Sequence, residues 1–136
     1  MIFMDNDHAQ RWAAAIQTAG AVRDDDTVKG DFGASLYILT GLPSVYDRAQ
    51  QHIHPGYIDF EPMFHMGLSS GETVLVALAG NIYNGGFFGG YTPQDIVSYC
   101  DEEGVTLATK AILLRKAALN INTIFDWEAA LDGDLR

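Results

Sequence analysis

The chain has 136 residues, 48% of them hydrophobic, and its 18 acidic and 8 basic residues give a net charge of −10. This size and apolar content predict one globular domain and exclude an intrinsically disordered chain. No apolar run reaches the roughly 20 residues that a membrane helix needs, and the acidic balance repels a phosphate backbone, so we expect neither membrane nor direct nucleic-acid binding. Cys100 is the single cysteine and the N-terminus has no basic leader, which predicts a cytoplasmic protein.

The spacing of apolar residues predicts an all-α fold, a single domain of six or seven helices, because no stretch alternates apolar and polar residues long enough for a strand. Start signals such as Thr92 followed by Pro93 mark the helix ends. A short helical turn is expected at 62–65, Gly104 is expected to separate two helices, and the tail from about 133 is expected to fray. In chain order, the predicted helices cover residues 7–19, 27–40, 43–52, 69–84, 93–102, 105–119 and 124–131.

The most apolar segment, residues 69–84, is predicted to be the central buried helix of the bundle. Ser69 followed three residues later by Glu72 forms a capping box, in which each side chain accepts a hydrogen bond from the other residue's backbone N–H. Apolar residues then occupy nearly the whole circumference, which is typical of a helix surrounded by others. In the glycine-rich loop that follows, Phe87 and Phe88 are expected to fill the core.

Residues 67–71 match the Gly-x-Ser-x-Gly motif of a hydrolase nucleophile elbow. That motif needs a buried strand before the serine and a sheet to carry its partners, and the predicted fold supplies neither. We therefore interpret Ser69 as a helix cap. Cys100 has no basic neighbour to lower its pKa and is interpreted as a small core residue. No catalytic residue is predicted.

A cluster of histidines and carboxylates near the end of the third predicted helix is the best metal-like pattern. Its members are His52, His54, Glu61 and His65, with Asp59 nearby. Imidazole and carboxylate groups are zinc ligands, but two histidines spaced two residues apart on a helix point to different faces. We therefore predict no metal and no cofactor, and keep a small enzyme with a site around 52–65 as an alternative.

Two acidic runs are the candidate partner-binding residues. They are Asp24, Asp25, Asp26, Asp101, Glu102 and Glu103. Both runs fall at predicted helix junctions, so they can lie at the same end of the bundle and attract a basic protein. The alternative interpretation is that they are solvated surface that serves only solubility.

Four segments of the chain, taken in order, carry a resemblance. They are Phe-x-Asp-x-Asp-His at 3–8, LYILTGLPSVYDRAQQHI at 36–53, the serine-capped helix at 69–84, and Tyr-Thr-Pro-Gln-Asp-Ile at 91–96. Together they resemble a family of small uncharacterised all-helical proteins from Gram-positive bacteria and their phages or mobile elements. The resemblance implies a helical fold and a mobile-element origin. It carries no assigned activity, so it implies no catalytic residue.

Three functional hypotheses follow from these observations. The first is a non-enzymatic acidic interaction protein that binds a basic protein partner, as inhibitors that mimic nucleic-acid charge do. The second is the small enzyme with the His/carboxylate site. The third is a structural or regulatory module that associates with itself, for example as a homodimer. An exposed aromatic patch favours the first or third hypothesis, whereas a pocket holding histidines and carboxylates favours the second.

Overall fold

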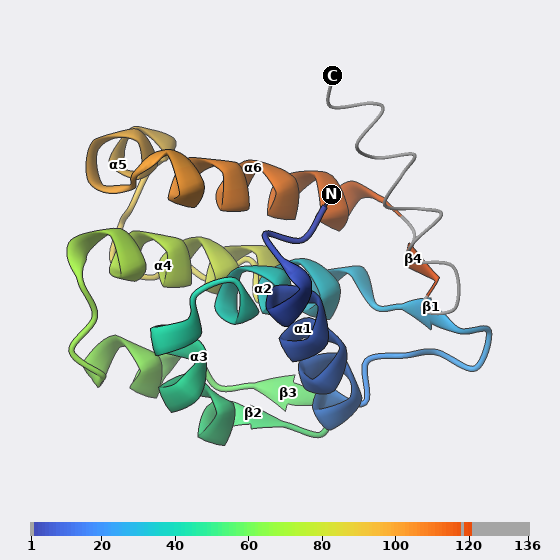
Figure 1. Cartoon of the computed structure of the whole chain (residues 1–136). Coiled ribbons are helices and arrows are strands. Elements are labelled where there is room, and N and C mark those ends of the chain that lie inside the picture. The colour runs from blue at the N-terminus through green and yellow to red at the C-terminus, as the bar shows by residue number, and fades with distance from the viewer. Residues whose placement is uncertain (1, 118, 121–136) are drawn as a thin grey trace.

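Six α-helices make up most of the computed structural model, which describes residues 2–117 and 119–120 (Figure 1). The all-α fold class is therefore confirmed. The chain between the helices includes two 3-10 turns, at Gln50–His52 and Glu61–His65, and the second confirms the short turn expected at 62–65. The helices are α1 (Asn6–Ala19), α2 (Gly30–Thr40), α3 (Pro43–Ala49), α4 (Ser70–Asn84), α5 (Pro93–Tyr99) and α6 (Glu102–Lys116). The predicted helix at 124–131 and the tail from 133 lie outside the described residues.

Two short strand pairs were missed by the sequence prediction. Strand β1 (Thr27–Val28) pairs antiparallel with β4 (Leu119–Asn120), and β2 (Ile53–His54) pairs with β3 (Tyr57–Ile58). The expectation of no strand is wrong at these places because strands of two residues are too short to show alternation. The pairing at 27–28 also explains why α2 begins later than predicted.

The break between α5 and α6 also differs from the prediction. Gly104 lies inside the first turn of α6, and the chain turns instead at Cys100 and Asp101. The carboxylate of Asp101 accepts a hydrogen bond from the Gly104 N–H at 2.8 Å, so Asp101 caps α6. An aspartate that satisfies a free N–H at a helix start outweighs the modest helix-breaking tendency of one glycine.

The central position belongs to α2, whereas residues 69–84 were expected to hold it. Nine of the 11 residues of α2 are buried, and the helix contacts α1, α3, α4 and α6. Helix α4 exposes Asn81 and Asn84 on its outer side. Helix α2 buries residues around nearly its whole circumference, with Leu36, Tyr37 and Ile38 each 0% exposed, whereas α4 turns polar residues to the outside.

Polar groups that enter this core bond to backbone carbonyls. The indole N–H of Trp12 donates to the Gly33 carbonyl at 2.9 Å and joins α1 to α2. The hydroxyl of Ser35 donates to the Ala79 carbonyl at 2.9 Å and joins α2 to α4. Within the described residues, no buried side-chain nitrogen or oxygen lacks a partner. These bonds set the register of the helices against one another, because an unpaired buried polar group is costly.

The capping box at the start of α4 is confirmed, and it makes a stability prediction. The Ser69 hydroxyl oxygen accepts from the Glu72 N–H at 3.2 Å, and the Glu72 carboxylate accepts from the Ser69 N–H at 2.8 Å. We expect Ser69→Ala to lower the free energy of unfolding by about 1 kcal/mol, measured by urea denaturation. The matched control is Ser70→Ala, since Ser70 is exposed and one residue inside the helix. Equal losses for both variants would contradict the cap.

Candidate functional site

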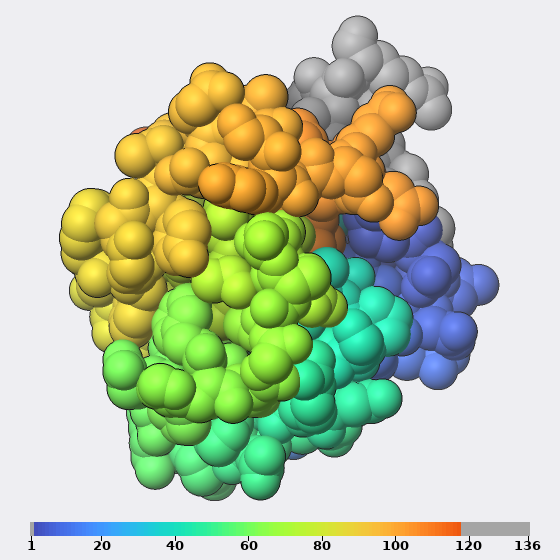
Figure 2. Space-filling view, turned by 90° about the vertical axis from the view of Figure 1, so that its left-hand side faces the viewer, coloured from blue at the N-terminus to red at the C-terminus, as the bar shows by residue number. Residues whose placement is uncertain are grey.

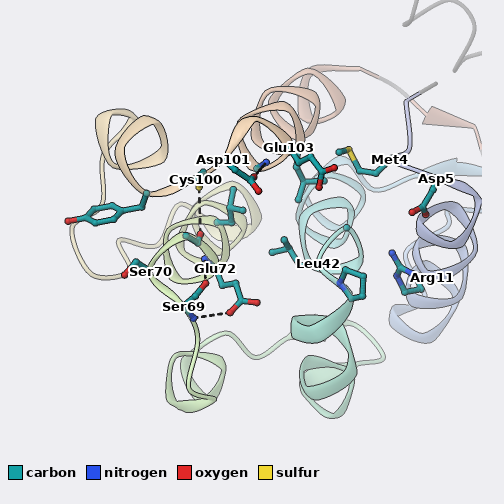
Figure 3. Close-up of a pocket in the computed structure, with 17 residues that line it drawn as sticks. Met4, Asp5, Arg11, Leu42, Ser69, Ser70, Glu72, Cys100, Asp101 and Glu103 are labelled. Carbon is teal, nitrogen blue, oxygen red and sulfur yellow. Dashed lines mark hydrogen bonds between the residues drawn. The ribbon is translucent and has the colours of Figure 1, made fainter.

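A cleft with a volume of about 650 Å³ opens where the N-terminal ends of α3, α4 and α6 meet residues 4–11. Figure 3 shows side chains from α1, α4 and α6 facing one another across it, with Leu42 between them. Four carboxylates line the cleft, namely those of Asp5, Glu72, Asp101 and Glu103. Arg11 is the one basic side chain among its described lining residues. The cleft is therefore acidic.

Local capping chemistry places three of these carboxylates. Asp5 caps α1 by accepting from the His8 N–H at 2.7 Å, and Asp101 caps α6 in the same way. Glu72 belongs to the capping box of α4. Each carboxylate lies at the positive end of a helix dipole, which favours its negative charge. The acidic cleft thus arises because the tertiary fold brings three capped helix starts together.

Glu72 is the most firmly held of the four carboxylates. One oxygen accepts from the Ser69 N–H, and the other accepts from the Ser44 hydroxyl at 2.9 Å. The hydrogen bond from the Ser69 backbone, opposed by partial burial and aided by Ser44, holds the pKa of Glu72 below its usual value. Glu72 therefore remains ionised at neutral pH and presents a fixed negative charge to the cleft.

Arg11 and Glu103 differ in whether their side chains are hydrogen-bonded to the rest of the protein. The Arg11 Nε donates to the Thr40 carbonyl at the end of α2, at 2.7 Å, so this guanidinium is tied to the protein. Glu103 is exposed, and its carboxylate has no hydrogen bond or ion pair within the described part of the chain. It is the carboxylate of the cleft that is most available to a cationic ligand.

Neither Cys100 nor Ser69, the nucleophile candidates among the described residues of the cleft, is activated. The Cys100 thiol lies 3.7 Å from the Gly71 carbonyl, and burial raises its pKa, so the thiol stays protonated at neutral pH. No histidine is among the described residues that line the cleft. Ser69, the serine of the elbow-like motif, is occupied as a helix cap. The four carboxylates of the cleft are suited to binding a cation.

The structure brings together only part of the predicted acidic set. Asp101 and Glu103 line the cleft, and Glu102 is exposed outside it. Asp24, Asp25 and Asp26 precede β1, whose partner β4 follows the far end of α6 (Figure 1). The 15 residues of α6 rise about 22 Å. The expectation that both runs lie at one end of the bundle is therefore wrong.

The aspartate run makes a local turn instead. The Thr27 hydroxyl donates to the Asp25 carboxylate at 2.6 Å, and the Thr27 N–H donates to the same oxygen at 3.1 Å. These bonds, chiefly the one from the hydroxyl, lower the pKa of Asp25. Asp26 has a positive φ of 67°, which an aspartate tolerates in a tight turn. The run therefore shapes the turn before β1.

The histidines and acidic residues of the alternative site around 52–65 lie in different surroundings. His52 and His54 are half-buried, and the His54 ring stacks on Tyr57 with 4.6 Å between centroids. Glu61 and His65 are exposed on the 3-10 turn. Among the residues described, no three histidine, cysteine or acidic side chains are grouped as metal ligands. The small-enzyme alternative gains no support from this geometry.

Sequence reasoning did identify Glu72 as part of a capping box, but it did not identify Glu72 as a cleft residue. Caps are local signals, whereas their convergence depends on how helices far apart in the sequence pack. Nothing in the sequence around Arg11 predicts that it lines this cleft. Its role depends on the Thr40 carbonyl, 29 positions along the chain.

Comparison of the chain with known protein families, curated proteins and solved structures gave no match. The family resemblance of the sequence stays a prediction. Within the described residues, no helix combines the length and the apolar character needed to cross a bilayer.

Proposed function

We propose that this protein is a non-enzymatic binding protein that takes a basic segment of a protein partner into its acidic cleft. The observation that carries the proposal is the gathering of four carboxylates from three helix starts in one cleft, with the tethered guanidinium of Arg11 on one of its walls. The net charge of −10 adds a long-range attraction for such a partner and a repulsion for nucleic acid.

The rigidity of the carboxylates supports this function. Asp5, Glu72 and Asp101 are already held by hydrogen bonds to helix-start N–H groups, so little side-chain entropy is lost when a cation binds. A guanidinium can donate to two carboxylate oxygens at once, which makes arginine the best-suited ligand. Because Arg11 stands on one wall, the ligand charge is expected to sit toward α4 and α6.

A pair of charge reversals tests the proposal. Glu103→Lys and Glu102→Lys change the net charge equally, but only Glu103 lines the cleft. With a fluorescein-labelled arginine-rich peptide as probe, we expect Glu103→Lys to weaken binding about tenfold or more, and Glu102→Lys about threefold or less, because a like charge inside the cleft acts at short range. Binding is measured by fluorescence anisotropy in about 0.1 M salt, where distant charges are screened.

Two results would contradict the proposal. An equal loss for both reversals would mean that the probe responds to the overall charge and not to the cleft. If the unmodified protein binds the arginine-rich probe no more tightly than a neutral peptide of the same length, the proposal of a cationic ligand would be wrong.

A further inference from the structure

The acidic cleft continues into two smaller hollows along α5. A hollow of about 400 Å³ shares Ser70 and Tyr99 with the cleft. A third hollow, of about 320 Å³, shares Val74 and Tyr91 with the second. Shared lining residues connect the three, which follow one another from Tyr99 at the C-terminal end of α5 to Pro93 at its N-terminal end, and we call them together the groove. Figure 2 views the molecule from this side. The start of α4 (light green) lies between the start of α6 (orange) and α3 (blue-green), and the yellow residues lie beside the start of α4.

The far end of this groove is apolar, in contrast to the cleft. No charged side chain lines the third hollow among the described residues. Phe87, at its edge, is 81% exposed, and Ile112 is 54% exposed. The expectation that both phenylalanines fill the core holds only for Phe88, whose ring lies 5.6 Å from that of Phe64. Exposed apolar side chains grouped around a hollow mark a surface where another molecule binds.

We propose that the groove binds one polypeptide segment with a basic residue in the acidic cleft and an aromatic or large aliphatic residue in the apolar hollow. This inference rests on the proposed function and adds a second, apolar requirement to the partner. The charge pattern argues for such a segment, since four carboxylates gather in the cleft, Asp95 lines the second hollow, and no charged side chain among the described residues lines the third. Burial of the apolar residue supplies affinity, and the cation sets the direction of the segment.

The length of α5 sets the spacing of the two residues. Helix α5 has seven residues and is therefore about 10 Å long. An extended peptide covers about 3.3 Å per residue, so about three to five positions separate the basic residue from the apolar one. A second copy of this chain is a poorer occupant, because its net charge of −10 would meet the acidic end of the groove.

The test uses selection of random dodecapeptides displayed on phage against the full chain. We expect the selected peptides to combine arginine or lysine with an aromatic or large aliphatic residue at this spacing. A synthetic peptide of the selected sequence then serves as probe with Phe87→Ser and Tyr57→Ser, since Tyr57 is 52% exposed but lies on β3, away from the groove lining. Phe87→Ser should weaken binding about tenfold and Tyr57→Ser less than twofold.

The possible failures separate the two proposals. Selected peptides that share only basic residues, and that bind Phe87→Ser normally, would overturn this inference and leave the proposed function in place. Absence of any basic preference would overturn both. A concentration-dependent dimer in sedimentation velocity that Phe87→Ser abolishes would mean that a second copy occupies the apolar end, and this too would overturn the inference.

Discussion

Leu36→Ala is expected to lower the free energy of unfolding by about 2–5 kcal/mol, the usual range for emptying a buried leucine site in a core. Leu36 lies on α2 and is 0% exposed. It belongs to the helix that contacts four others, so the surrounding side chains have little freedom to close the cavity. The measurement is urea denaturation followed by far-UV circular dichroism.

The control for this prediction is Leu78→Ala on α4. Leu78 is half-buried and packs against the edge of the core, so its truncation removes less buried surface. The pair asks which helix is central. A greater loss of stability for Leu78→Ala than for Leu36→Ala would contradict the assignment of α2 as the central helix.

The second large effect concerns His8, which is fully buried in the core. Its Nδ1 accepts from the Met4 N–H at 3.0 Å, and its Nε2 lies 2.8 Å from the Tyr37 carbonyl. A carbonyl can only accept and an amide N–H can only donate, so the ring is neutral with its proton on Nε2. Burial lowers the pKa of His8 to about 4, although the bond to Tyr37 opposes that shift.

This lowered pKa makes stability depend on pH in a defined direction. In the unfolded chain a histidine titrates near pH 6.5, so between about pH 6.5 and 4 the unfolded state binds a proton that the folded state does not. The stabilisation is therefore complete above the unfolded pKa and is lost as the pH falls through this interval. Lowering the pH from 7 to 5 should reduce the free energy of unfolding by about 2 kcal/mol.

Urea denaturation at pH 7 and pH 5 measures this effect and separates it from that of the carboxylates. The stabilisation from Glu72 and Asp25, whose pKa values are lowered, is lost mainly below the usual carboxyl range near pH 4. His65→Gln, at an exposed position, should keep the pH dependence, and His8→Gln should flatten it. A protein whose stability changes by less than about 0.5 kcal/mol over this interval would contradict a neutral buried His8.

What the sequence determined by itself is the local structure at the helix ends. The Ser69 cap of α4 and the Thr92–Pro93 start of α5 both follow from residues within a few positions of one another. Such signals are complete within a short window. The pairing of β1 with β4 escaped prediction because its two strands lie more than 90 positions apart, and the pairing of β2 with β3 because each strand is only two residues long.

What only the tertiary structure decided is the central helix and the candidate site. Both α2 and α4 are apolar enough to be buried, and the choice between them depended on which of the two the other helices pack around. The acidic cleft depends on the same packing. Gly71 lets α4 approach the end of α5 so closely that a Cβ there would lie 2.8 Å from the Tyr99 carbonyl oxygen. The sequence shows which residues are acidic. Only the packing of the helices places Asp101 and Glu103 beside Asp5 and Glu72 and leaves residues 24–26 at the other end of α6. Distances between residues far apart in the sequence cannot be inferred from a few neighbouring residues.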